Sequence, residues 1–255
     1  MKSQSAAPER ICVFGHEATG KTRAWAETAK VYRDTDTPGT FRVVNWEPGA
    51  IDRLSDGYDL SNVEWIDVRT WVDLVQTTAL YWKASTPGDW LVVENSARTW
   101  EAVQEAYEEH YLRQIGWTRA EGDIFADAPV DESPARWQRI NAEYYRWIDA
   151  LMDPGQNPAH LLITAPEKPV VVPQGKKGEW ADDKQTVELF QWLGMRPDAQ
   201  KRLAHQVHTV LWMRHPRQDE WTITSAKDRE RGLLADQQVV SFPYTYLVEK
   251  GGWTL

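Results

Sequence analysis

One segment of the chain reads Ile11-Cys12-Val13-Phe14-Gly15-His16-Glu17-Ala18-Thr19-Gly20-Lys21-Thr22. Its first four residues form an apolar run typical of a buried strand, and residues 23–33 after it are compatible with a helix. Residues 15–22 match G-x-x-x-x-G-K-[ST] in full. In a turn from strand to helix, such glycines let backbone N–H groups surround phosphate oxygens at the positive end of the helix. The segment therefore predicts a nucleoside triphosphate site, with a glycine-bearing surface turn as the alternative.

The residues of this phosphate loop, residues 15–22, have separate expected roles. Lys21 would reach the β- and γ-phosphates, and Thr22 would offer its hydroxyl to Mg²⁺. The nucleotide contacts are expected from Gly15, His16, Glu17, Ala18, Thr19, Gly20, Lys21 and Thr22. ATP and Mg²⁺ are thus the expected cofactors.

A nucleotide-bound Mg²⁺ also needs an acidic residue at the end of a nearby strand. Glu94 follows the apolar run 90–93, and Asp67 follows residues 63–66. We favour Glu94, because a run without charges fits a central buried strand better. Aspartate is usual here, and the longer Glu94 side chain can act through water or double as a base. Asp67 stays the alternative.

Strand-like and helical segments alternate along the rest of the chain. Further strands are expected at residues 41–46, 63–68, 90–93, 160–164, 207–213 and 221–225, and helices at 70–84, 97–113 and 134–152. This alternation predicts an α/β fold with a mainly parallel central sheet flanked by helices. From His205 onward we expect two or three antiparallel strands at the sheet edge. The predicted organisation is a flexible segment 1–10 and one domain 11–255, with loop insertions at about 116–133 and 166–183.

Composition excludes several classes of protein. Lys and Arg number 29 against 38 Asp and Glu, a net charge of −9, which argues against coating duplex DNA by bulk charge. The single cysteine, Cys12, excludes an internal disulfide framework and a zinc site built on several thiolates. Without a long apolar stretch or an apolar signal region, the expected protein is soluble, cytoplasmic and without a membrane partner. The 15 Trp show no fixed period and are interpreted as core and interface residues.

The phosphate loop also resembles that of the RecA recombinase family, Gly-Pro-Glu-Ser-Ser-Gly-Lys-Thr. The shared Glu17 is not required by the general pattern. The next expected strand ends in Asn45-Trp46-Glu47. In RecA-like proteins a glutamate that closes this strand orients the attacking water, so the resemblance gives Glu47 the role of base. A carboxylate at a strand end beside the loop can polarise water for in-line attack.

Two further positions follow from the resemblance. Thr164, at the end of a later strand, takes the place of a polar residue that senses the γ-phosphate, where the family usually has Gln or Asn. Lys227 and Arg229, with Arg231 as a further candidate, resemble cations carried into the neighbouring subunit's ATP site. Two residues apart on an extended segment, Lys227 and Arg229 would point the same way. The alternative is a solvated charge cluster at residues 227–231.

The sequence looks most like the short RecA-like ATPases that many phages encode, some of which act in single-strand annealing and recombination. The likeness covers roughly residues 11–231 in order, with close identity confined to the motifs. It implies a phage-encoded P-loop ATPase that hydrolyses ATP to ADP and phosphate. It also implies head-to-tail assembly into a ring or filament that acts on single-stranded DNA in recombination, annealing or replication.

The family's DNA-binding loops suggest where single-stranded DNA would bind. The later loop, residues 166–183, carries a cationic set with one aromatic residue that could stack a base: Lys168, Lys176, Lys177 and Trp180. A solvated turn is the alternative for Lys176 and Lys177. The acidic segment 116–133 would repel phosphate. His205 and His208 are not expected to bind a metal, since within a strand they would face opposite sides.

Two other functions remain open. The net charge and the acidic segment would suit a nucleotide-switched assembly or packaging module that does not bind DNA, and such a module would show no salt-dependent affinity for single strands. A small-molecule kinase would need an arginine-rich lid, and residues 166–183 contain no Arg.

Overall fold

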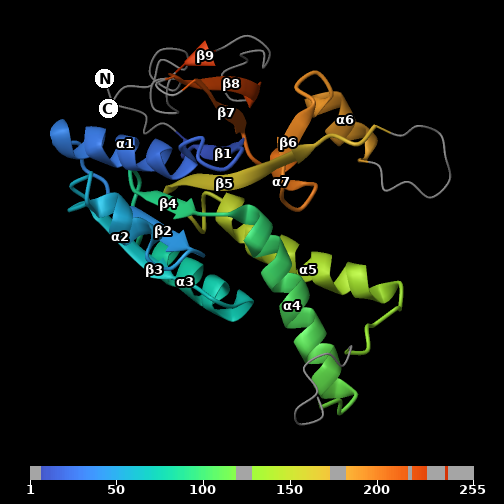
Figure 1. Ribbon diagram of the computed structural model, residues 1–255. Helices are drawn as coiled ribbons and strands as arrows, with labels where there is room; N and C mark the ends of the chain where they lie inside the picture. The colour runs from blue at the N-terminus through green and yellow to red at the C-terminus, as the bar shows by residue number, and fades with distance from the viewer. Residues whose placement is uncertain (1–6, 119–127, 173–181, 218–219, 229–238, 241–255) are drawn as a thin grey trace.

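The computed structural model describes residues 7–118, 128–172, 182–217, 220–228 and 239–240 (Figure 1). The strands are β1 (Arg10–Gly15), β2 (Phe41–Asn45), β3 (Val63–Asp67), β4 (Trp90–Val93), β5 (His160–Pro169), β6 (Met195–Pro197), β7 (Thr209–Arg217), β8 (Glu220–Asp228) and β9 (Val239–Val240). The helices are α1 (Lys21–Asp34), α2 (Ala50–Ser55), α3 (Trp71–Ala84), α4 (Ser96–Gln114), α5 (Ala135–Met152), α6 (Lys184–Phe190) and α7 (Leu203–Gln206).

The strands form one sheet in the order β3-β2-β4-β5-β1-β7-β8-β9, with β6 paired to β5 outside this path. Pairing is parallel from β3 to β7, and β8 and β9 add on in antiparallel fashion. The predicted α/β class, with a mainly parallel central sheet flanked by helices and antiparallel C-terminal strands, is confirmed. Since β1, β2, β4 and β5 are parallel, their carboxyl ends meet at one sheet edge, where open α/β sheets bind ligands.

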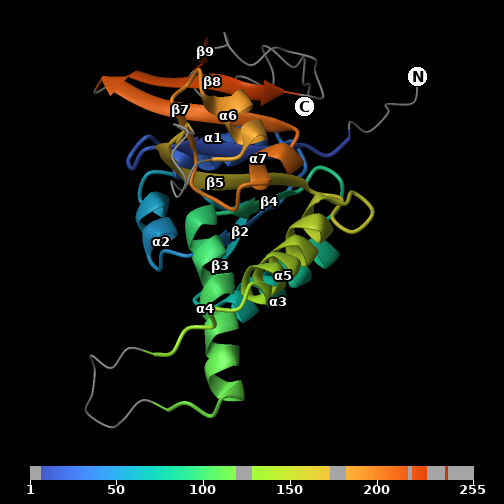
Figure 2. The same cartoon turned by 90° about the vertical axis from the view of Figure 1, so that its right-hand side faces the viewer.

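Two apolar cores cover the two faces of the sheet. Ile11 and Val13 of β1 pack in the core that contains α1 and α2, whereas Cys12 and Phe14 pack in the core that contains α3, α4 and α5. Successive strand residues point to opposite faces, so a strand covered on both sides needs an unbroken apolar run. In both views α4 runs from the sheet edge outward (Figures 1 and 2). Among the described residues, no helix has the length and apolar character required to span a bilayer.

The structure corrects several predicted boundaries. β1 begins at Arg10, which is fully buried, so the proposed flexible segment 1–10 extends too far. β5 continues to Pro169 and pairs with β6, so the first part of the predicted loop 166–183 is strand. Prolines have no N–H to donate to a strand ladder, so Pro166 and Pro169 indicated a loop. They fit the last part of β5 because its partner there, β6, is short. β7 pairs in parallel with β1 and antiparallel with β8, so the predicted antiparallel part of the sheet begins between β7 and β8. Residues 119–127 and 173–181, within the two predicted insertions, lie outside the described residues.

Candidate functional site

The phosphate loop lies between the end of β1 and the start of α1. Ala18 and Gly20 have positive φ angles of 59° and 87°. A Cβ atom on Gly15 would lie 2.2 Å from the main-chain oxygen of Met213 in β7, so no larger residue fits there. Gly15 thus allows β7 to approach β1 closely, and Gly20 allows the left-handed conformation before α1. The helix that follows directs its positive end toward the loop, as an anion site requires.

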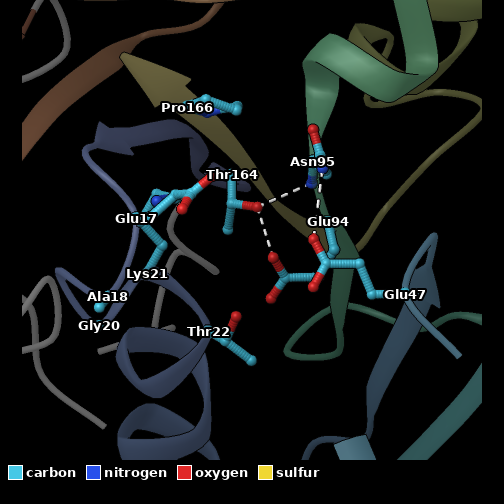
Figure 3. Close-up of a pocket in the computed structure, with 10 residues that line it drawn as sticks. All are labelled: Glu17, Ala18, Gly20, Lys21, Thr22, Glu47, Glu94, Asn95, Thr164 and Pro166. Atoms are coloured by element: carbon cyan, nitrogen blue, oxygen red, sulfur yellow. Dashed lines mark hydrogen bonds between the residues drawn. The ribbon is translucent and has the colours of Figure 1, made fainter. Parts of the chain in front are cut away.

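A cavity of about 600 Å³ opens beside this loop (Figure 3). We call it the phosphate-loop cavity. It brings together residues from the loop, α1 and the carboxyl ends of β2, β4 and β5: Glu17, Ala18, Gly20, Lys21, Thr22, Glu47, Glu94, Asn95, Thr164 and Pro166. Its size lies within the usual range for small-molecule sites, roughly 300–1,000 Å³. The parallel sheet therefore collects in one place residues that are far apart in the sequence.

Lys21 provides the positive charge of the cavity. Its Nζ donates hydrogen bonds to the main-chain oxygens of Gly15 at 3.0 Å and His16 at 2.7 Å. Burial lowers the pKa of the Lys21 ammonium from its ordinary value, and nearby carboxylates, Glu94 first among them, act in the opposite direction. The ammonium is thus held at the loop, within an acidic surrounding.

Glu94 is a buried carboxylate, 8% exposed, at the end of central strand β4. It accepts hydrogen bonds from the Trp25 indole and from the Thr164 hydroxyl. Burial raises the pKa of Glu94, and hydrogen bonds from Thr164, Trp25 and Thr22 oppose that rise. A fixed carboxylate beside a threonine hydroxyl suits Mg²⁺, which takes oxygen ligands and fills its other positions with phosphate oxygens and water. The residues present therefore fit the expected cation.

Asp67, the alternative acid for Mg²⁺, lies outside the phosphate-loop cavity. It closes β3 at the outer side of the sheet, where its carboxylate accepts a hydrogen bond of 2.7 Å from Asn45 Nδ2. It is exposed and does not line the phosphate-loop cavity. Of the two candidates, Glu94 occupies the position that a nucleotide-bound cation would need.

Glu47 follows the end of β2 and is exposed to the cavity. The Asn45 side chain holds the Glu47 main chain through two hydrogen bonds. Asn45 Nδ2 donates to the Glu47 main-chain oxygen at 2.7 Å, and the Glu47 N–H donates to Asn45 Oδ1 at 3.1 Å. The Glu47 carboxylate accepts a hydrogen bond of 3.4 Å from Asn95 Nδ2 (Figure 3). The carboxylate expected to act on water thus faces the cavity beside Glu94.

Asn95 also lines the cavity and was not among the predicted site residues. It has a positive φ of 56°, and its Oδ1 accepts the Arg98 N–H to cap α4. Its own N–H donates to Thr164 Oγ1 at 2.9 Å. Thr164 therefore links the middle of β5 to the end of β4 by bonding both to Asn95 and to Glu94. An asparagine between an apolar strand and a helix is a recognisable N-cap signal that could have identified this position.

Lys227 is 7% exposed, and its ammonium donates hydrogen bonds to the main-chain oxygens of Ala204 at 2.8 Å, His205 at 3.0 Å and Val207. It therefore caps the C-terminal end of α7 within its own chain, a favourable place for a cation. The predicted action in a neighbour's site stays untested, and this buried position gives it no support. Arg229 and Arg231 lie outside the described residues.

The predicted DNA contacts are mostly beyond the described part of the chain. Lys168 lies in β5 and forms an ion pair with Asp198. Lys176, Lys177 and Trp180 lie outside the described residues. Within the described ranges, no group of three or more His, Cys, Asp or Glu residues could hold a metal ion, and His205 and His208 belong to none.

The chain matches no protein-family model and no curated protein. Among solved structures it is similar to a chain described as an ATPase domain, with a TM-score of 0.45 and 10% sequence identity. The match covers 92% of this chain and 82% of that one. A likeness of this degree assigns no activity or site residue to the present chain.

Proposed function

We propose that the chain is a RecA-like P-loop ATPase that binds ATP with Mg²⁺, hydrolyses it to ADP and phosphate, and acts on single-stranded DNA as a head-to-tail assembly. One observation carries the ATPase proposal. Lys21 and Thr22 of the phosphate loop, Glu47 after β2 and Glu94 after β4 were predicted from three separate parts of the sequence, and all four line the same cavity. Together they supply the cation, hydroxyl, metal-binding acid and base that phosphoryl transfer to water needs.

Binding would begin at the phosphate loop. Backbone N–H groups of the loop and the start of α1 would hold the phosphate oxygens. The Lys21 ammonium would exchange its two main-chain acceptors for β- and γ-phosphate oxygens. The Thr22 hydroxyl and the Glu94 carboxylate would hold Mg²⁺, directly or through water. When bound, Mg²⁺ neutralises charge on the phosphate oxygens.

Glu47 would act on the water that attacks the γ-phosphorus. It takes a proton as the new P–O bond forms and the bond from phosphorus to the β–γ bridging oxygen breaks, so that ADP leaves with that oxygen. The Asn95 amide would hold one Glu47 oxygen and leave the other for water. Through its hydrogen bonds to Glu94 and Asn95, Thr164 would transmit a change at the γ-phosphate to β5.

The DNA and assembly parts of the proposal are supported by the family resemblance and by the cations and aromatic residue predicted in residues 166–183. The net charge of −9 favours the competing function, a nucleotide-switched assembly module without DNA binding. Both share the same ATP site, and DNA-dependent turnover separates them.

The decisive variant for hydrolysis is Glu47→Gln, which keeps an acceptor for Asn95 but removes the base. We expect turnover to fall by about 10²- to 10⁴-fold while ATP affinity changes by less than about twofold. Asp52→Asn, an exposed carboxylate in α2, is the matched control and should leave turnover unchanged. Unchanged turnover in Glu47→Gln would remove Glu47 as the base, and absence of ATP binding in the wild-type protein would remove the whole proposal.

A further inference from the structure

A stack of aromatic and cationic side chains lies on the side of the phosphate loop away from Glu94. β7 pairs with β1 up to Phe14↔Trp212 and then continues to Arg217, past the end of β1. β8 returns beside it and places Trp221 next to the loop. A Cβ atom on Gly20 would lie 3.3 Å from the Trp221 Nε1 atom. The indole therefore adjoins the residue directly before α1.

The Trp221 indole has two planar partners, the His215 ring and the Arg23 guanidinium. The His215 ring stacks on it with centroids 4.4 Å apart and an interplanar angle of 10°. The Arg23 guanidinium carbon lies 4.9 Å from the indole centroid. Arg23 is held by Glu27, whose Oε1 accepts two hydrogen bonds of 3.1 Å from it. We call Arg23, His215 and Trp221 the Trp221 stack; three different elements position it.

Sheet order indicates which end of a nucleotide would reach this stack. β2, β4 and β5, which carry Glu47, Glu94 and Thr164, lie on one side of β1, and β7 and β8 lie on the other (Figure 1). In the proposed function the γ-phosphate faces the first side. The triphosphate would lie along the phosphate loop at the end of β1, so the ribose and base would lie on the side of β7 and β8. Arg23 directly follows Thr22 on α1, and its guanidinium contacts Trp221 of β8 on that second side.

We propose that the Trp221 stack is the nucleobase subsite of this chain, and that the flat base of the bound nucleotide extends it by one layer against Arg23. Aromatic rings and guanidinium planes both stack on bases, and such contacts tolerate different bases because every base has a π-face. The subsite therefore supplies affinity for a nucleoside triphosphate over a bare polyphosphate, with little choice between purines. This inference rests on the proposed function, because it assumes that the loop holds the triphosphate.

The test compares two ligands, ATP and inorganic tripolyphosphate, each with Mg²⁺, on the full chain by calorimetry. Trp221→Ala should weaken ATP binding by about tenfold or more and change tripolyphosphate binding by less than about twofold. Trp221→Phe keeps an aromatic face and should retain most of the ATP affinity. Trp137→Ala is the control, since that tryptophan is 44% exposed on α5, remote in the fold from the loop.

Several outcomes would overturn the inference. Equal losses for ATP and tripolyphosphate in Trp221→Ala would mean that the indole only shapes the loop, and unchanged ATP binding would mean that the base lies elsewhere. If Trp221→Ala fails to fold, Arg23→Ala and His215→Ala replace it, with the same selective loss of ATP expected. Failure of the proposed function looks different, since the wild-type protein would then bind neither ligand.

Discussion

At the scale of single residues, Glu94 combines its proposed role in binding Mg²⁺ with an unfavourable burial. Its folded-state pKa is raised mainly by desolvation, so the folded chain holds the proton more tightly than the unfolded chain does. Stability from this group is therefore present at low pH and is lost as pH rises through the ordinary range of a glutamate toward the raised value. At neutral pH, the negative charge of Glu94 that would bind a cation therefore destabilises the folded chain.

This conflict predicts the behaviour of Glu94→Gln. Turnover should be lost, because the neutral amide cannot hold Mg²⁺, while the melting temperature at neutral pH should exceed that of the wild-type protein. The gain in melting temperature should shrink as pH is lowered, since wild-type Glu94 then becomes neutral as well. Asp67→Asn, the same change at the exposed end of β3, should alter neither property. Thermal melts across a pH series, with turnover at each pH, test this; a gain that does not depend on pH would contradict it.

The residues that could be predicted from sequence are those tied to a strand end. Glu47, Glu94 and Thr164 each follow an apolar run, Lys21 and Thr22 belong to the motif that follows such a run, and a parallel sheet brings these segments together. Trp25 and Trp221 could not be predicted in this way. Their contacts with Glu94 and the Gly20 turn depend on how α1 and β8 pack in three dimensions, and no local pattern distinguishes them from the other tryptophans.

At the scale of elements, Arg10 joins the start of β1 to α5 and β5. Its guanidinium is fully buried and donates hydrogen bonds to the main-chain oxygens of Met152, Asn157 and Ala159. Burial lowers its pKa to about 10. This one side chain serves acceptors where α5 ends and at the turn into β5, and buried main-chain oxygens need such donors.

Replacing Arg10 should therefore destabilise the whole chain. Arg10→Met keeps the length of the side chain but removes the donor to these three acceptors, two of them in buried hydrogen bonds, and we expect a loss of about 3 kcal/mol in the free energy of unfolding. Arg146→Met on the exposed face of α5 should cost less than about 0.5 kcal/mol. Urea unfolding of the three proteins measures both values. Equal stability of Arg10→Met and wild type would show that the acceptors find other donors.

Among the helices, the long ones were predictable and the short ones were not. The stripe of Ile140, Tyr144, Trp147 and Leu151 in α5 recurs every three or four residues and faces the core as a helix requires. Helices α2, α6 and α7 have seven residues or fewer, too few for such a period to be visible. They form because the sheet and the longer helices provide a surface on which to pack.

At the scale of the whole molecule, the net charge of −9 limits how the chain could bind DNA. Bulk attraction is absent, so any affinity for single strands must come from a few local cations such as Lys168, Lys176 and Lys177. Two to three phosphate contacts predict a slope of roughly −1.5 to −2 for the logarithm of affinity against the logarithm of salt concentration. A pure assembly module would show no slope.

This difference makes ATP turnover with and without a short single-stranded oligonucleotide the measurement that separates the two functions. We expect stimulation that fades with salt and rises more steeply than linearly with protein concentration, because an assembly on DNA would share sites between subunits. An oligonucleotide of the same sequence with an uncharged backbone is the control, and it should not stimulate. Turnover that ignores DNA at every salt concentration would leave the ATP site in place and favour the nucleotide-switched module. A charged strand and its uncharged counterpart that stimulate equally would instead place recognition in the bases, with no part for the three lysines.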